Sequence, residues 1–219
     1  MKIFRSFLDV NNRLADLGTS REFILEAIEA AVGAANESTD NDPNGTRGWR
    51  RWQMGTRRIR EVHVGHVGHE DWNRDNTDQI ASIVNSRRGI RIIVCNTDDG
   101  TCIEDRNPKN RSRKGSATER VIDANQTSFM SVLDESVADA LKRRRPDGSL
   151  TTYALCIYHE GEDIRAELSC VIETSGGFFE VFSERIFIIG GEAGEPDPIK
   201  RRRSDDGDSE FDIPVIRKR

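Results

Sequence analysis

Two arginine-rich stretches carry the residues of this chain whose types suggest a chemical role. Residues 47–60 (RGWRRWQMGTRRIR) hold six arginines and no acid, and residues 106–118 (RNPKNRSRKGSAT) hold five cations and no acid. The whole chain nevertheless has a net charge of −5, so the rest of the sequence is strongly acidic. Local positive charge on an acidic protein favours a defined anionic partner, most simply phosphate.

The first stretch interleaves tryptophans with arginines. Arginine forks pair with phosphates, and an indole face can stack on a nucleobase. The pattern therefore predicts contact with nucleic acid or a nucleotide through Arg50, Arg51, Trp52, Arg57 and Arg58. In the alternative interpretation the tryptophans belong to the core, and the arginines are solvated or paired with acids.

The second stretch has the composition of a loop, because its Pro, Asn and Gly residues break any periodicity. Cations and hydroxyl groups beside a glycine can hold a phosphate, which makes Arg111, Arg113, Lys114 and Ser116 candidate ligands. The stretch lacks the GxxxxGK[ST] pattern of a Walker loop. The alternative is a mobile surface loop.

Three of the four histidines stand three residues apart, at His63, His66 and His69, and Glu70 and Asp71 follow them. Imidazoles with a carboxylate suit zinc, so this cluster is a candidate metal site. Turn histidines, or core histidines with satisfied hydrogen bonds, are the alternative. No HExxH pattern accompanies the cluster.

Evidence for an enzyme is weak in this sequence. No serine nucleophile elbow, GxGxxG or kinase motif is present. Asp163 and Glu167 have the spacing of restriction-type nuclease acids, but Ser169 occupies the place of the lysine that such a site needs. The missing motifs count against catalysis and leave a binding role open.

Two pairs of segments carry a resemblance to known proteins. The sequences CNTDDGT and RNPKNRSRKGSAT, together with DIRAELSC and SERIFI, resemble segments of uncharacterised proteins from phages and mobile elements, over roughly residues 90–189. The resemblance brings no known activity. It implies a phage protein whose partner is host nucleic acid or a host protein of the defence machinery.

The N-terminal region has the spacing of two amphipathic helices. Ile3, Phe7, Val10, Leu14 and Leu17 form one apolar stripe that ends at Gly18, and a second stripe follows a capping box at residues 19–22. We expect a helical hairpin. Because its stripes offer more apolar surface than one intrachain partner obviously covers, we also expect a homodimer through this hairpin.

The remainder reads as strands and further helices. Alternation over Ile164–Ile172 predicts a half-buried antiparallel strand with Leu168 in the core and Glu167 at the surface. We further expect strands at 90–95, 101–104, 151–158 and 178–189, and helices at 76–89 and 129–144.

These elements predict an α+β fold, with an N-terminal helical hairpin followed by an antiparallel β-sheet that has helices packed on one side. The expected organisation is a hairpin at 1–36, a linker at 37–47, a core domain at 48–190 and a charged, mobile tail at 191–219. No run is long enough for a membrane span, and four cysteines without CxxC spacing suggest reduced thiols in the cytoplasm.

Three functional hypotheses follow. The first is a non-enzymatic binding protein whose basic surface contacts nucleic acid or nucleotide phosphates. The second is an inhibitor or regulator that binds another protein. The third is a metal-dependent phosphodiesterase that uses the histidine cluster. They are ranked in this order because the absent motifs argue only against the enzyme.

Overall fold

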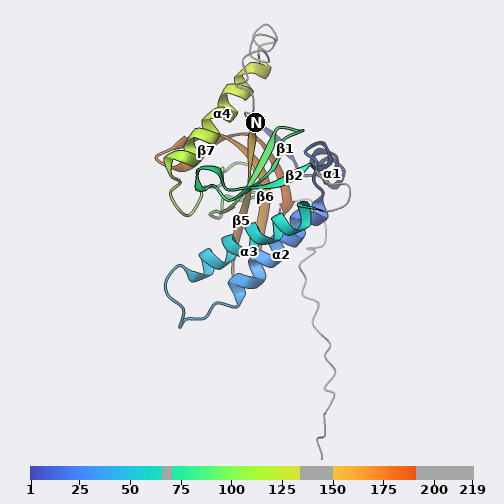
Figure 1. The fold of residues 1–219 in the computed structure, drawn as a ribbon. Helices are drawn as coiled ribbons and strands as arrows, with labels where there is room; N and C mark the ends of the chain where they lie inside the picture. Colours follow the sequence, from blue (N-terminus) through green and yellow to red (C-terminus); the bar gives the residue numbers. More distant parts are fainter. Residues whose placement is uncertain (66–70, 134–149, 191–219) are drawn as a thin grey trace, which may run out of the picture.

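The computed structural model describes residues 1–65, 71–133 and 150–190, with residues 127–133 described by their backbone. Within these residues a seven-stranded mixed sheet is combined with four α-helices, which confirms the predicted α+β class. Figure 1 shows the sheet between helices that lie below it and a helix that lies above it. The proposed tail at 191–219 lies outside the described residues.

The sheet has the strand order β1-β7-β6-β5-β4-β3-β2. Its strands are β1 (Lys2–Phe4), β2 (Trp72–Asp75), β3 (Ser82–Asn85), β4 (Ile90–Asn96), β5 (Thr151–Glu160), β6 (Asp163–Ser175) and β7 (Phe178–Ile189). Two of the neighbouring pairs, β1 with β7 and β4 with β5, are parallel. The expectation of a wholly antiparallel sheet was therefore wrong, because β4 and β5 are joined by a crossover rather than by a hairpin.

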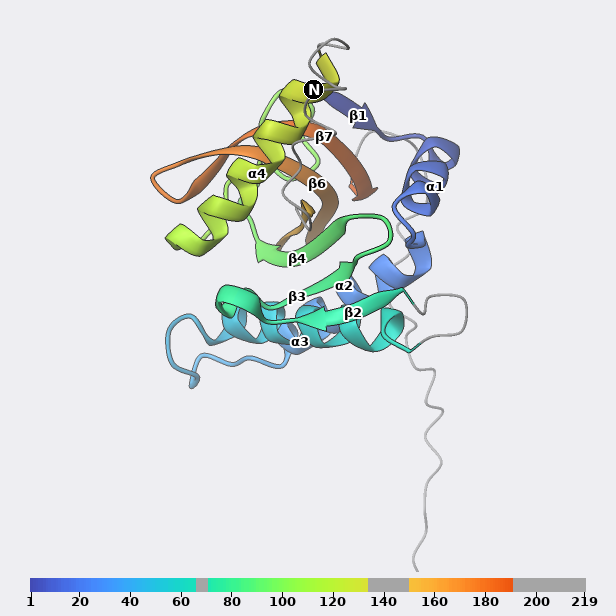
Figure 2. The ribbon, with the colours of Figure 1, turned by 45° about the horizontal axis from the view of Figure 1, so that its top comes forward.

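The helices are α1 (Phe7–Asp16), α2 (Arg21–Asn36), α3 (Thr46–His63) and α4 (Ser116–Leu133), with a short 3-10 turn at Thr77–Gln79. Figure 2 shows α2 and α3 on one side of the sheet and α4 on the other. Helices thus cover both faces, not one. The crossover from β4 to β5 runs through α4, which shields the face that α1–α3 leave open.

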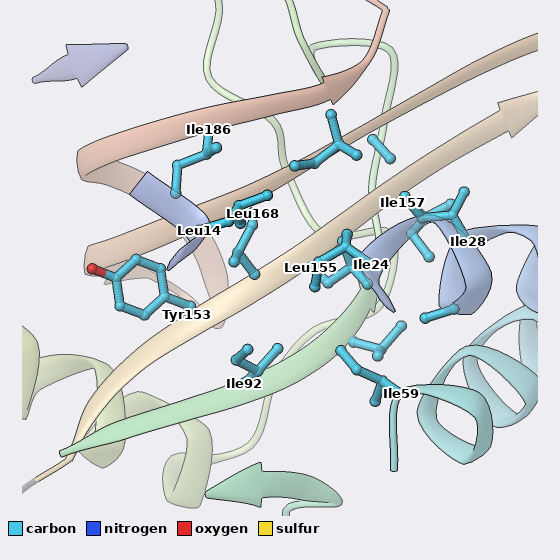
Figure 3. Close-up of a cluster of buried hydrophobic side chains, with 14 of the residues drawn as sticks. Leu14, Ile24, Ile28, Ile59, Ile92, Tyr153, Leu155, Ile157, Leu168 and Ile186 are labelled. Carbon is cyan, nitrogen blue, oxygen red and sulfur yellow. The ribbon is translucent and has the colours of Figure 1, made fainter. Parts of the chain in front are cut away.

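Two buried clusters match the two faces. On β4, Ile92 and Val94 belong to the cluster with α1–α3, whereas Ile93 and Cys95 belong to the cluster with Ile122 of α4. Figure 3 shows the larger cluster, in which side chains of α1, α2 and α3 pack on the central strands. This cluster spans the predicted boundary at residues 37–47, since it joins the first two helices to the sheet.

The close helix pair is α2 with α3, not α1 with α2. A Cβ atom at Gly55 would lie 3.2 Å from both Ala31 Cβ and Val94 Cγ1, so the bare glycine lets α3 approach α2 and β4 together. The predicted stripe before Gly18 is only partly covered within the chain: Val10, Leu14 and Leu17 are buried, Ile3 lies in β1, and 53% of the Phe7 surface is exposed. The homodimer therefore stays a prediction.

Three local predictions were wrong. Residues 82–85 form β3 rather than part of a helix, residues 101–104 form turns rather than a return strand, and α4 begins at Ser116 rather than Phe129. The β-branched run at Ile83 and Val84 pairs with β4, and sheet pairing overrides the capping signal at Asn76. The predicted helix at 129–144 lies outside the described residues from 134 onward.

Strand β6 contains one confirmed and one wrong prediction. Leu168 is buried, as expected, but Glu167 is also completely buried. Its carboxylate accepts hydrogen bonds from the Nε and Nη2 atoms of Arg185 at 2.8 and 2.6 Å. Because both faces of β6 are covered, the polar side of its alternation lies inside and requires a partner.

The four cysteines are all free and buried. No helix in the described ranges is long and apolar enough to cross a membrane.

Candidate phosphate-binding pocket

The first arginine-rich stretch forms most of α3. Its N-cap, Gly45, has a φ of 88° and gives no side-chain cap, and the first turn contains no acid. The Thr46 N–H donates to the Pro43 carbonyl at 3.1 Å, so the N–H groups of Arg47 and Gly48 are the ones left for water or a ligand, at the positive end of an 18-residue helix. Arg47, Trp49, Arg51 and Trp52 all lie within the first two turns.

The second stretch is a loop that other residues hold in place. The Arg111 N–H donates to the Asn96 carbonyl at 2.9 Å, next to the end of β4. Asn110 is buried, and its Nδ2 donates to the Gly177 carbonyl while its Oδ1 accepts from the Phe179 N–H. These bonds fix the loop to the turn between β6 and β7, which is not the arrangement of a mobile surface loop.

Gly177 brings the chain near Lys114 into position. Its φ is 84°, and a Cβ there would lie 2.7 Å from the Lys114 carbonyl oxygen. The Lys114 N–H also donates to the Gly177 carbonyl at 2.9 Å. Only a glycine permits both this backbone conformation and this close approach.

The two basic stretches meet at one cavity of about 580 Å³. Its cations are Arg47 and Arg51 from α3 and Arg111 and Lys114 from the loop, and no acidic residue lines it. The other lining residues are Gly45, Gly48, Trp49, Trp52, Asn96 and Ser112. The cavity lies at the carboxyl end of β4, where ligands commonly bind beside parallel strands.

Arg51 is the unusual member of this set. Only 3% of its surface is exposed, and its Nε and Nη1 atoms are buried without a hydrogen-bond partner in the described structure. Burial, and then the charges of Arg111 and Arg47, lower the pKa of Arg51 to about 10. The guanidinium is therefore still charged at neutral pH, and no described carboxylate pairs with it.

The Arg111 side chain is partly fixed by its neighbours beside the cavity. Its Nε donates to the Thr97 carbonyl at 3.1 Å, and its Nη2 lies 3.6 Å from the exposed carboxylate of Glu160. Such a weakly paired, partly fixed guanidinium can turn to an incoming anion at little cost in side-chain entropy.

Two further polar residues at this end of the sheet were not identified from the sequence. Asn96 Nδ2 donates to the Gly48 carbonyl at 2.7 Å, and its buried Oδ1 has no partner. His159 on β5 is 5% exposed, and its buried Nδ1 has no partner in the described part of the chain. Burial, then the charge of Arg51, lowers the pKa of His159.

The nine predicted phosphate ligands fall into two groups. Arg51, Trp52, Arg111 and Lys114 line the cavity. The others, which do not line it, are Arg50, Arg57, Arg58, Arg113 and Ser116. In this second group, Arg57 and Arg58 form ion pairs with Glu61, and Arg58 also pairs with Glu26. Arg50 lies 3.9 Å from Asp42.

The position of Trp52 is compatible with both interpretations that the sequence left open. Its half-buried indole packs against the main hydrophobic cluster and also lines the cavity. Trp49 is different, because 56% of its surface is exposed at the same cavity.

The histidine cluster is only partly described. His63 is completely buried; one ring nitrogen lies 2.7 Å from Thr19 Oγ1 and the other 2.8 Å from the Ile59 carbonyl. Both ring nitrogens are engaged in the core, which favours the alternative of a core histidine with satisfied hydrogen bonds over a zinc ligand at His63. His66 and His69 lie outside the described residues. Among residues 1–65, 71–133 and 150–190, no group of three His, Cys, Asp or Glu could hold a metal ion.

Comparison with family models, with curated proteins and with solved structures gave no match to this chain. The resemblance to phage proteins therefore stays a prediction, and the candidate site rests on its own geometry.

Proposed function

We propose that this protein binds phosphate groups of a nucleotide or nucleic acid in the cavity between α3 and the loop at residues 97–115. The observation that carries the proposal is Arg51, a buried guanidinium with two unpaired nitrogens beside three further cations and no acid. The proposal concerns binding and includes no reaction.

The buried charge of Arg51 needs an opposite charge to offset its cost. A buried charge without a partner costs several kcal/mol, on the order of the whole stability of a domain. Folded proteins seldom carry such a charge in a cavity unless something pairs with it. Since no described side chain does so for Arg51, an external anion supplies the missing partner.

The surroundings favour phosphate over a single carboxylate. Four cations line one cavity, and a helix N-terminus adds free N–H groups and a partial positive charge. Guanidinium groups match two phosphate oxygens at once, and Ser112 adds a hydroxyl at the same wall. An anion with several acceptor oxygens uses more of these donors than a carboxylate can.

The test is a binding titration with the full chain and two variants that remove the same charge from the same helix. Arg51→Met removes the buried cation, and Arg57→Met removes an exposed one that pairs with Glu61 outside the cavity. We expect Arg51→Met to weaken binding of single-stranded nucleic acid or nucleotide by at least about tenfold, the lower range for a charged hydrogen bond. Arg57→Met should change it less than about twofold.

Repeating the titration at several salt concentrations measures how many phosphates the cavity neutralises. Up to four phosphates neutralised at the cavity correspond to a log–log slope of about −1 to −3 on single strands. If neither DNA, RNA, nucleotides nor inorganic phosphate binds at about 50 mM salt, the proposal is wrong. The hypothesis of a regulator that binds another protein then takes first place.

A further inference from the structure

The cations of the cavity are arranged in depth. Arg47 and Arg111 are exposed at the rim, and Lys114 is partly buried. Arg51 also lines the cavity, but only 3% of its surface is exposed. A phosphate that reaches Arg51 must therefore enter the cavity rather than touch its rim.

The burial of Arg51 favours a terminal phosphate over the internal phosphodiesters of a duplex. Phosphates within a duplex lie along a stiff rod and carry a sugar on either side, so they meet rim cations but not an enclosed one. A terminal phosphate has a single substituent and can enter first. It also carries a charge of about −1.5 to −2 near pH 7, against −1 for an internal phosphodiester. The larger charge suits a cavity with four cations and no acid.

The tryptophans indicate what is attached to that phosphate. Trp49 and Trp52 are three residues apart on α3, so they lie on neighbouring parts of one helix surface, and both line the cavity. Trp49 is 56% exposed and has no aromatic or cation–π contact among the described residues. An exposed indole at a phosphate site is suited to stack on a base. The volume of about 580 Å³ is in the usual range for a small-molecule ligand.

We infer that the ligand of this cavity is a nucleoside with a terminal phosphate, either a free nucleotide or the phosphorylated end of a single strand. The phosphate lies against Arg51 and the N-terminus of α3, and the base stacks on Trp49. This inference rests on the proposed function and narrows it from phosphates in general to phosphate monoesters.

The experiment compares matched probes by competition against the full-length protein. The strand probes are one short single-stranded oligonucleotide with a 5′-phosphate, with a 3′-phosphate and with hydroxyls at both ends, together with a duplex of the same sequence. The small probes are a nucleoside monophosphate, its nucleoside and inorganic phosphate. They separate the free-nucleotide source from the strand-end source.

We expect at least one phosphorylated end to bind about tenfold or more tightly than the hydroxyl end. We expect the nucleoside monophosphate to exceed its nucleoside by a similar factor. Arg51→Met should remove this preference, while Arg57→Met keeps it. Trp49→Ala should weaken the nucleotide by about tenfold and leave inorganic phosphate nearly unchanged, whereas Phe7→Ala, which removes an exposed ring on α1, changes neither.

The two possible failures can be told apart. If phosphorylated and hydroxyl ends bind equally, and the duplex binds as well as the single strand, the monoester inference is wrong while phosphate binding stands. If no probe binds, including inorganic phosphate, the proposed function is wrong as well.

Discussion

Arg51 and Arg185 are two buried arginines with opposite surroundings. Arg185 is completely buried on β7 and forms two hydrogen bonds with Glu167. Its remaining donors reach carbonyls of the loop after β4, at Gly100, Ile103 and Arg106. Arg51 is 3% exposed on α3, and its buried Nε and Nη1 have no described partner.

The comparison separates a structural charge from one that is available to a ligand. Arg185 and Glu167 neutralise each other, and Glu167 also accepts from the Cys102 N–H at 2.6 Å and the Ser169 hydroxyl at 2.7 Å. This closed network fastens the loop that carries Arg111 to the sheet. Arg51 has the same chemistry and similar burial, and what it lacks is an anion. Under the proposed function, the first site holds the loop to the sheet, and the second lowers stability until a ligand binds.

The largest expected effect comes from breaking the closed network. Arg185→Met should lower the free energy of unfolding by about 3–5 kcal/mol, because it leaves the Glu167 carboxylate buried and unpaired. Denaturant unfolding measures this loss. The double variant Glu167→Gln with Arg185→Met should recover part of it, since the stranded charge is then gone. A loss below about 1 kcal/mol would mean that this pair behaves as an exposed one.

A gain in the free energy of unfolding, rather than a loss, is expected when Arg51 is replaced. Arg51→Met should raise the free energy of unfolding by about 1–3 kcal/mol without ligand, because a buried unpaired charge is replaced by an apolar chain of similar length. The control Arg57→Met should stay within about 0.5 kcal/mol of the wild type. Equal losses in Arg51→Met and Arg185→Met would remove the distinction between the two arginines.

A smaller effect is expected from His159. Its pKa lies below the ordinary value of 6.5, first because of burial and next because of the Arg51 charge; Arg47 lowers it further, while a Gly161 backbone hydrogen bond and Glu162 oppose the shift. The unfolded chain thus binds this proton at a higher pH than the folded chain. The stability held above pH 6.5 should therefore decline as the pH falls below it.

Thermal unfolding of wild type and His159→Gln at several pH values between about 5 and 8 tests this relation. The variant should show the shallower decline. A bound phosphate should also reduce the decline in the wild type, because it offsets the positive charges that disfavour protonation. An identical pH profile in the two proteins would contradict the role given to His159.

Local signals predicted several elements of the fold. A side-chain cap does precede α2, but one residue later than the predicted box: the N-cap is Ser20, whose Oγ accepts from the Phe23 N–H at 3.2 Å, whereas Thr19 Oγ1 lies 2.7 Å from a ring nitrogen of His63. The alternation of β6 is that of a strand, as predicted. The parallel pairing of β4 with β5 was not predictable from local pattern, because it depends on a crossover about fifty residues long. The burial of Glu167 was not predictable either, because its partners are Arg185 and the Cys102 N–H of the loop that follows β4.

For the candidate site, the sequence showed which residues carry the positive charge, but not which of them lie together at the cavity. It indicated both basic stretches, and their convergence at one cavity was a matter of tertiary structure. One signal was overlooked: Arg51 precedes Gly55, Ile59 and Val62 at helical spacing, so it lies on the buried face of α3. Its lack of a partner could not be read from sequence, because acids elsewhere in the chain might have reached it, as Glu26 reaches Arg58.

The most direct test is the thermal stability of the wild type and Arg51→Met with and without a nucleoside monophosphate. Without ligand, Arg51→Met should melt at the higher temperature. Ligand at about one hundred times the wild-type dissociation constant should stabilise the wild type by about 2.7 kcal/mol, and the variant, which binds at least about tenfold more weakly, by about 1.4 kcal/mol or less. A variant that melts below the wild type and is stabilised by the ligand as much as the wild type would contradict the account of Arg51 as the cation that awaits an external phosphate.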